Sequence, residues 1–305
     1  MTRPWYQKVL RSPNHVRSMM VNYYGLTKLF LRDVRINRAL RRISTVESRT
    51  LAEMRQRYEA TYQQQDRPLV SVLIPTYNRG LLLAERTLPS VLNQSYQNFE
   101  IVIVGDRCTD DTEQRVTQLG DPRIRFENLP ERGSYPEDPY SRWMVAGTVP
   151  SNRALELALG SWIAFLDDDD LFTPDHIEVL LDFARTGDYE LVYGRFKTEL
   201  QPDLWVERGR STFLNGRPPY RGEGIHPSSG IYRSYLRFFK GDLEAWRYAM
   251  PGDYWVWHRM GRSGVRAGYL PRVVCLQPLR PGETMPTNTA IQRASAKVQE
   301  KEKAP

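Results

Sequence analysis

The stretch WIAFLDDDDLFTPDH, residues 162–176, places four consecutive carboxylates directly after a short apolar run. The run is typical of a buried strand, and Pro174 marks the first turn of the helix that follows. Adjacent carboxylates repel one another, so each makes ionisation of the others less favourable. One or two of them would suffice to cap the helix. Because no Lys or Arg lies within six residues on either side, a divalent cation, which prefers oxygen ligands, is the simplest group to offset the charge.

The segments around this stretch alternate between strand-like and helix-like patterns. Short runs rich in Val, Leu and Ile predict strands, and longer amphipathic segments predict helices. Strands are expected at 69–77, 99–106, 123–128 and 161–166, separated by helices at 80–94, 108–120, 149–160 and 174–187. This order predicts an α/β fold with a mostly parallel central sheet flanked by helices. Later in the chain, shorter strands are expected at 191–200, 228–233 and 272–277, and a helix at 251–261.

Three of the predicted strands end in loops that carry polar side chains. These loops span residues 75–79, 105–109 and 167–170. In parallel sheets, ligands bind beyond the carboxyl ends of the strands, where the strand–helix loops meet. The sequence therefore predicts one ligand site built from the three loops.

The composition of the chain is that of an ordinary globular protein. Its 305 residues are 40% apolar and 26% charged, which is ample for a core. No run of 18 apolar residues predicts a membrane-spanning helix, and the first twenty residues lack the features of a secretory leader. Cys108 and Cys275 lie far apart and indicate neither a disulfide framework nor a zinc site. A cytoplasmic location is therefore expected.

The sequence also lacks the glycine-rich loops of common nucleotide-binding folds. It has no GxxxxGKS/T segment, which argues against a P-loop triphosphatase, and no GxGxxG after its first strand, which argues against a dinucleotide fold. A cation held by one or two carboxylates keeps open positions that substrate phosphates commonly fill. The pattern favours a metal–diphosphate site at the mouth of the sheet.

Four segments resemble the family 2 glycosyltransferases of the GT-A fold. They are VSVLIPTYNR (70–79), TLPSVLNQSYQNFEIVIVGDRCTDDT (87–112), SNRALELALGSWIAFLDDDDLFTPD (151–175) and GDYWVWHRM (252–260). The resemblance implies an enzyme that moves a sugar from a nucleoside diphosphate donor, with a UDP-sugar favoured, to an acceptor hydroxyl. It also implies inversion at the anomeric carbon and a divalent metal, Mn or Mg, at the aspartate run, which matches the DxD motif of the family.

By position, the resemblance assigns the donor nucleotide to the first two loops. Pro75, Thr76, Tyr77 and Arg79 are expected to border the base, and Asp106 is expected to contact it. The alternative for Thr76 and Tyr77 is a simple strand exit, and for Asp106 an Asx turn.

The resemblance divides the aspartate run between two roles. Asp167 and Asp168 are expected near the ribose of the donor, and Asp169 is expected to ligate the metal directly. A bound cation then acts as a Lewis acid toward the leaving diphosphate.

A further donor contact is expected from Asn152, which matches an asparagine that the family places before a helix. Ser151 stands where the family commonly has an arginine. The source of a positive contact to the diphosphate is therefore open, with Arg153 and Arg142 as the candidates.

Inverting transfer needs a general base for the acceptor hydroxyl, usually a carboxylate or a histidine. The segment MPGDYWVWHRM (250–260) resembles the acidic helix start at which the family has its base, so Asp253 is the candidate. The family often has Glu before this Asp, where this chain has Gly252. The alternative role for Asp253 is to cap the helix.

The acceptor is expected to lie against later loops. The segment 128–150 is rich in Pro, Tyr and Gly and is expected to be an irregular binding loop. Its Tyr135, Tyr140 and Trp143 either offer flat faces to a sugar ring or fix the loop to the body. His226 is a candidate acceptor contact, with a structural hydrogen bond as its favoured role. The remaining tryptophans of this region are expected in the core: Trp246, Trp255 and Trp257.

Residues 1–65 form a basic arm, with thirteen Lys and Arg against four Asp and Glu, whereas the whole chain carries +7. Two helical segments are expected in the arm, the second opening at Ser44 in a capping box with Glu47. The arm either packs on the main domain or docks on the inner face of a membrane, where each basic residue contributes about 1 kcal/mol. The other expected units are a catalytic domain at 66–285, divided into a nucleotide half (66–185) and an acceptor half (186–285), and a polar, flexible tail at 286–305.

Two other functions share part of this pattern. A sugar nucleotidyltransferase needs a glycine-rich basic loop after its first strand, where IPTYNRGLLL (74–83) has one Gly and one Arg. A non-catalytic nucleotide-sugar or glycan-binding module would be expected to lose the aspartates or the base, which this chain keeps. Because the basic residues concentrate in the arm, no nucleic-acid partner is expected. The expected acceptor is a glycan or a lipid-linked sugar, and the expected process is the synthesis of a surface glycan or polysaccharide.

Overall fold

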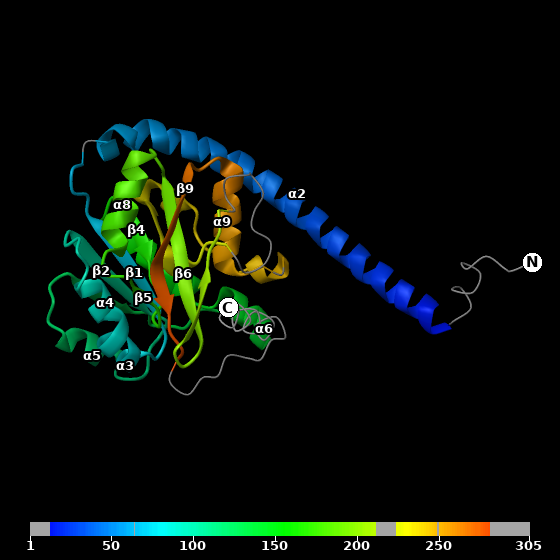
Figure 1. Cartoon of the computed structure of the whole chain (residues 1–305), viewed down its shortest axis with the longest axis horizontal. Helices are drawn as coiled ribbons and strands as arrows, with labels where there is room; N and C mark the ends of the chain where they lie inside the picture. The colour runs from blue at the N-terminus through cyan, green and yellow to red at the C-terminus, as the bar shows by residue number, and fades with distance from the viewer. Residues whose placement is uncertain (1–12, 64, 212–223, 249, 281–305) are drawn as a thin grey trace, which may run out of the picture.

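The structure, a computed structural model, describes residues 13–63, 65–211, 224–248 and 250–280. For the first helix, side chains are described from Val34 onward, apart from residues 35, 59 and 63. The first twelve residues of the predicted arm and the predicted tail at 286–305 lie outside the described residues. One twisted sheet runs through the body, and helices cover both of its faces (Figure 1).

The central sheet has nine strands in the order β3-β2-β1-β4-β8-β6-β9-β5, with β7 paired to β6. The neighbours β3, β2, β1 and β4 are parallel, as are β6 and β9, whereas β8, β7 and β5 run antiparallel to their partners. The expectation of a mostly parallel sheet with flanking helices is confirmed. The strands are β1 (Val70–Thr76), β2 (Phe99–Gly105), β3 (Ile124–Asn128), β4 (Trp162–Phe165), β5 (Leu171–Phe172), β6 (Leu191–Gln201), β7 (Leu204–Arg208), β8 (Gly230–Arg233) and β9 (Ala267–Gln277).

The helices vary in length, and the loop expected at 128–150 contains a short one, α6. Between β1 and β2 the helical segment includes one π-helical turn, η1, a feature often found at functional sites. The α-helices are α2 (Pro13–Gln63), α3 (Gly80–Leu82), α4 (Leu88–Leu92), α5 (Thr112–Gln118), α6 (Pro139–Val145), α7 (Thr148–Leu157), α8 (His176–Thr186) and α9 (Gly252–Ser263), and the other turns are η1 (Leu83–Thr87), η3 (Pro227–Ser229), η4 (Ser234–Phe238) and η5 (Ala245–Tyr248).

The two faces of the sheet carry separate hydrophobic cores. Alternate residues of a strand point to opposite faces, so Val72 and Ile74 of β1 pack with α4 and α8, whereas Leu73 packs with α7 and α9. Helices cover both faces, which leaves the carboxyl ends of the strands as the place where polar loops reach solvent.

The helix α2 is continuous over 51 residues, and the expected break at Ser44 does not occur. The reason is a tertiary contact. Glu47, the predicted capping partner, instead accepts from Nε of Arg259 of α9 at 2.8 Å. Farther along α2, Leu51 is buried against the second core, and Figure 1 shows the C-terminal half of the helix lying over the body while the N-terminal half extends away from it.

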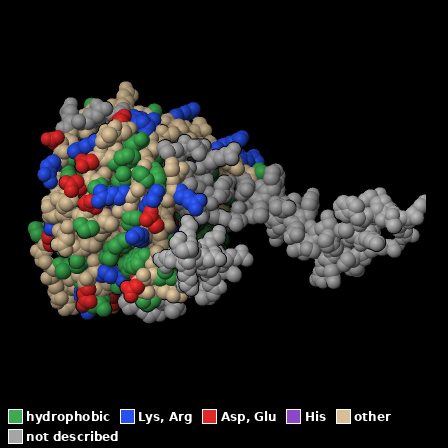
Figure 2. All heavy atoms as spheres, viewed as in Figure 1, with side chains coloured by type: hydrophobic (Ala, Val, Ile, Leu, Met, Phe, Trp, Pro, Cys, Tyr) green, Lys and Arg blue, Asp and Glu red, His purple; other side chains and the backbone are tan. Residues whose placement is uncertain are grey.

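The surface of the body mixes charges of both signs. Figure 2 shows Lys and Arg side chains interspersed with Asp and Glu on the face that it draws. Among the helices in the described ranges, α2 included, none has the length and apolar composition required to span a bilayer.

Candidate active site

The three predicted loops meet at the carboxyl ends of β1, β2 and β4. Thr76 Oγ1 donates to Asp168 Oδ2 at 2.8 Å, and the carbonyl of Thr76 accepts from the N–H of Asp106 at 2.8 Å. Asn78 joins the first two loops, because its Oδ1 accepts from the N–H of Thr109 at 2.8 Å. The structure thus brings the three loops together, as parallel pairing of β1 with both neighbours requires.

The aspartate loop concentrates negative charge in a recessed place. Desolvation, together with the nearby carboxylates of Asp169 and Asp168, raises the pKa of Asp167 to about 8. Burial and the charge of Asp169 likewise raise the pKa of Asp168 to about 6, although the hydrogen bond from Thr76 opposes this change. Raised pKa values mean that the loop resists full ionisation until a positive group is near.

The backbone of the aspartate loop is held by the π-helical turn η1. Arg86 Nη2 donates to the carbonyl of Asp169 at 2.5 Å, and Thr87 Oγ1 donates to the carbonyl of Asp168 at 2.9 Å. These two bonds fix the loop through its backbone and use no carboxylate oxygen.

The residues present fit a divalent cation. Asp169 is largely buried, with its side chain 13% exposed, and its carboxylate pairs with the guanidinium of Arg280. A positive group therefore already lies at the carboxylate that the sequence assigned to the metal. Carboxylate oxygens on a rigid loop are the ligand type that Mn²⁺ and Mg²⁺ take.

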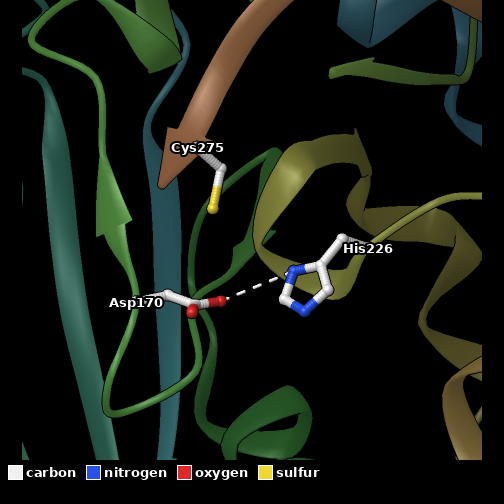
Figure 3. A group of neighbouring side chains, drawn as sticks. All are labelled: Asp170, His226 and Cys275. Atoms are coloured by element: carbon white, nitrogen blue, oxygen red, sulfur yellow. Dashed lines mark ion pairs between the residues drawn. The ribbon is translucent and has the colours of Figure 1, made fainter. Parts of the chain in front are cut away.

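The fourth aspartate is more deeply buried than the first three and shares its neighbours with Asp167, whose N–H donates to Ser228 Oγ at 3.0 Å and whose carboxylate lies 3.7 Å from His226 Nε2. Asp170 is 3% exposed and accepts from Ser228 Oγ at 2.6 Å. Figure 3 shows Asp170, His226 and Cys275 gathered from three segments, with His226 Nδ1 3.4 Å from the Asp170 carboxylate. Burial lowers the pKa of His226 to about 4, so the imidazole is neutral at pH 7. His226 also caps η3, and its Nε2 lies 2.7 Å from the amide nitrogen of Gln277, as expected for a structural hydrogen-bonding histidine.

The loops after β1 and β2 form a polar and aromatic edge next to the aspartates. Asp106 is 3% exposed and accepts from the N–H of Gly133 at 2.9 Å. Tyr77 is 37% exposed, and the guanidinium of Arg132 lies 3.7 Å from the centre of its ring and 3.7 Å from the Asp106 carboxylate. Sequence reasoning missed Arg132, because it lies in a loop without a family motif.

The remaining nucleotide-loop residues lie at the same mouth. Pro75 pairs with Val104 inside the sheet, next to the end of β1. Arg79 begins α3, and its charge lowers the pKa of Asp168, which places the guanidinium on the side of the carboxylates.

The three side chains considered for donor or diphosphate contact at 142–153 are engaged elsewhere. Asn152 exchanges two hydrogen bonds with the backbone of Gly241, at 3.0 and 2.9 Å. Arg153 pairs with Glu127 at 2.7 Å, and Arg142 donates to backbone carbonyls of its own loop. Asn152 therefore ties α7 to the segment that follows η4, and both arginines are bound to other groups in this conformation.

Asp253 stands in the first turn of α9. Burial raises its pKa to about 6, although backbone N–H groups at the helix start oppose the rise. Its negative charge contributes to the raised pKa of Asp167, so the two carboxylates lie within electrostatic reach of one another. A Cβ at the preceding Gly252 would lie 3.4 Å from Thr148 Oγ1, at ordinary contact distance. The helix start thus supplies an ionisable carboxylate that acts electrostatically on the aspartate loop.

The segment expected as a binding loop presents two exposed rings. Tyr140 and Trp143 are each 66% exposed and stack on one another along α6, with ring centres 6.0 Å apart. Tyr135 is instead mostly enclosed, and burial together with the Asp106 charge raises the pKa of its hydroxyl. The tryptophans expected in the core are buried or pack against it: Trp255, Trp257 and Trp246.

Comparisons with known proteins place the three loops within a family match. The model of the glycosyl transferase family 2 matches residues 71–135 and 151–241, which is about half of the chain and includes the three loops. An uncharacterized glycosyltransferase of Rickettsia felis is 32% identical over 148 residues, 48% of this chain and 22% of the relative. The GalNAc(5)-diNAcBac-PP-undecaprenol beta-1,3-glucosyltransferase of Campylobacter jejuni is 32% identical over 167 residues, 54% of this chain and 46% of the relative. The chain therefore spans less than half the length of these curated relatives.

Among solved structures, TarS of S. aureus, crystallised with UDP-GlcNAc, superposes with a TM-score of 0.55. The match covers 72% of this chain and 61% of that chain at 21% sequence identity. This likeness concerns the fold, and it confirms the GT-A architecture expected from the sequence.

Proposed function

The chain belongs to glycosyl transferase family 2, and we propose that it transfers a sugar from a nucleoside diphosphate donor to an acceptor hydroxyl, with inversion at the anomeric carbon. The observation that supports this proposal is the electrostatic action of Asp253, at the start of α9, on Asp167 of the aspartate loop. A donor site and a base facing one space are what single-displacement transfer needs.

The donor nucleotide would lie along the edge made by the first two loops. The aromatic face of Tyr77 and the carboxylate of Asp106 can stack against and hydrogen-bond a base, while Pro75, Thr76 and Arg79 border it. Asp167 and Asp168 would hold the ribose, and Asn152 would support the donor pocket indirectly through Gly241. A UDP-sugar is the favoured donor.

Asp169 is the proposed metal ligand. Its carboxylate would ligate Mn²⁺ or Mg²⁺, which when bound neutralises the charge that grows on the leaving diphosphate. Arg86 holds the backbone carbonyl of Asp169 and so fixes the loop from which this carboxylate projects.

Asp253 is the proposed general base. With a pKa of about 6, most Asp253 side chains are ionised at pH 7 and can accept the proton of an acceptor hydroxyl. Burial therefore keeps the carboxylate basic enough for proton transfer without neutralising it.

The acceptor is proposed to be a glycan or a lipid-linked sugar, in the synthesis of a surface glycan or polysaccharide. The name of the Campylobacter jejuni relative, an undecaprenol-linked glucosyltransferase, supports a lipid-linked acceptor. The basic arm is proposed to bring the enzyme to the inner membrane face, while residues from 36 onward attach α2 to the body. Peripheral attachment would place the catalytic mouth near such an acceptor.

The alternative is a non-catalytic module that binds a nucleotide sugar or a glycan on the same fold. Such a module would bind a donor without turnover. The ionisable Asp253 across from the aspartates favours the enzyme, because binding alone gives no reason to keep a base there.

The test replaces the base without changing the size of the side chain. Asp253→Asn should retain UDP affinity in calorimetry but lower the rate of UDP release from a UDP-sugar, with a lipid-linked glycan as acceptor, by about 10²- to 10⁴-fold. In the wild type the rate should rise with pH and be half-maximal near pH 6, because the ionised Asp253 is the active form. Asp182→Asn, a change on the exposed side of α8, is the matched control. Near-normal turnover in Asp253→Asn would remove the base assignment.

A further inference from the structure

The side chain of Arg280 reaches the carboxylate of Asp169 from a segment whose backbone is held by hydrogen bonds. It lies three residues after the end of β9. The preceding residue, Leu279, donates its N–H to Glu199 Oε2 at 2.9 Å, and its carbonyl accepts from Arg86 Nη1 at 3.1 Å. Arg86 also donates to the carbonyl of Asp169. One side chain thus connects the segment before Arg280 to the aspartate loop.

The side chain of Arg280 lies in the place where a cation is needed. Its Nε pairs with Oδ2 of Asp169, and its charge lowers the pKa of Asp167. A divalent cation ligated by Asp169 would use the same carboxylate and would repel the guanidinium. The two positive groups therefore exclude one another at this oxygen.

The displaced guanidinium would have a partner nearby. A donor diphosphate brings negative charge to the same mouth, and guanidinium geometry matches phosphate oxygens in paired hydrogen bonds. Arg153 and Arg142, the arginines considered from the sequence, are directed to other groups. The Arg280 side chain is 38% exposed, and turning it toward a diphosphate would leave the hydrogen bonds of the Leu279 backbone in place.

We propose that Arg280 is a donor-positioning residue that neutralises Asp169 before the cation binds and turns to the donor diphosphate when the cation takes its place. This inference rests on the proposed function, since it requires a metal–diphosphate donor site. It names Arg280 as the source of the positive contact to the diphosphate, which is open because Ser151 stands where the family commonly has an arginine. Arg280 then binds Asp169 in the absence of the cation and the donor diphosphate in its presence.

The experiment measures the affinities for Mn²⁺ and for UDP. A purely structural role of Arg280 would change both affinities in the same direction. Mn²⁺ binding to the donor-free protein is followed by electron paramagnetic resonance, and UDP binding at saturating Mn²⁺ by calorimetry. Arg280→Gln should bind Mn²⁺ about fivefold more tightly, because the competing charge is gone, and UDP about tenfold more weakly. Arg280→Lys should keep wild-type Mn²⁺ affinity and bind UDP with intermediate strength, because Lys keeps the charge and loses the paired geometry.

The matched control is Arg272→Gln, which removes an arginine of β9 that pairs with Asp175 at 2.5 Å, away from the aspartate loop. It should leave both affinities at wild-type values. Equal affinities in Arg280→Gln and Arg272→Gln, or a weakening of both Mn²⁺ and UDP in Arg280→Gln, would overturn the inference while leaving the proposed function in place. Absence of Mn²⁺ and UDP binding in the wild type would overturn both.

Discussion

An ion pair between Arg55 and the buried carboxylate of Glu190 attaches α2 to the body. Replacing Arg55 should lower the free energy of unfolding by an amount that can be worked out from the contacts of Glu190. Glu190 is fully buried and accepts four hydrogen bonds. Two come from Arg55 of α2, at 2.7 and 2.6 Å, one from the hydroxyl of Tyr235 at 2.6 Å, and one from the N–H of Arg266 at 2.7 Å. Arg55→Met keeps an apolar stem but removes these two bonds, the bond from Arg55 Nη2 to the carbonyl of Gly264 at 2.7 Å, and the positive charge.

The expected loss follows from what remains around Glu190. Breaking a buried ion pair costs about 3–5 kcal/mol. Tyr235 and the Arg266 N–H still bind the carboxylate, so the loss should lie near the lower end, about 3 kcal/mol. For a chain of this size that lowers the melting temperature by about 6–12 °C. The exposed Arg49, on the same helix, provides the control Arg49→Met.

The loss should depend on pH in a defined direction. Burial raises the pKa of Glu190, but the bonds from Arg55, Tyr235 and the Arg266 N–H outweigh it, so the pKa lies below its ordinary value. A carboxyl with a lowered folded-state pKa stabilises the fold above its unfolded pKa and loses this contribution as pH falls through the folded value. Without Arg55 the pKa rises, so the difference between variant and wild type should shrink toward pH 4.

Urea denaturation at pH 7.5 and at pH 4.5 measures both effects. A free energy of unfolding for Arg55→Met within about 0.5 kcal/mol of the wild type at pH 7.5 would refute the reasoning. A loss equal to that of Arg49→Met, or one that grows at pH 4.5, would refute it as well.

Two further predictions concern the metal and the arm. Mn²⁺ at a hundred times its dissociation constant should stabilise the wild type by about 2.7 kcal/mol and leave Asp169→Asn nearly unchanged in calorimetric melting; equal shifts in the two proteins would contradict the ligand assignment. The full chain should sediment with vesicles that contain anionic lipid and remain in solution with neutral vesicles, with binding lost at high salt; equal sedimentation with both vesicle types would remove the electrostatic role of the arm.

The mouth of the sheet could be predicted because it depends on local pattern and on topology. The apolar runs fix β1, β2 and β4, and parallel pairing then brings Thr76 and Asp106 to one edge. The excess of carboxylates beyond capping indicated a ligand. The structure adds a division within the run, because Asp170 turns inward to Ser228 and His226.

Long-range partners could not be predicted in the same way. Arg280 reaches Asp169 across 111 positions of sequence, and its place depends on Arg86 and Glu199, which carry no motif. The capping signal at Ser44 was wrong for a related reason. A local hydrogen bond would have satisfied Glu47, but Arg259 of α9 offers it a charged partner instead.

The proposed function requires the aspartate loop to hold a nucleoside diphosphate through a cation. Calorimetric titration of UDP, GDP and dTDP, each with Mn²⁺ and with excess chelator, measures this directly. We expect UDP to bind in the presence of Mn²⁺ and chelator to abolish the binding. Failure of all three nucleotides to bind a folded sample, or UDP binding of equal strength with chelator, would contradict it.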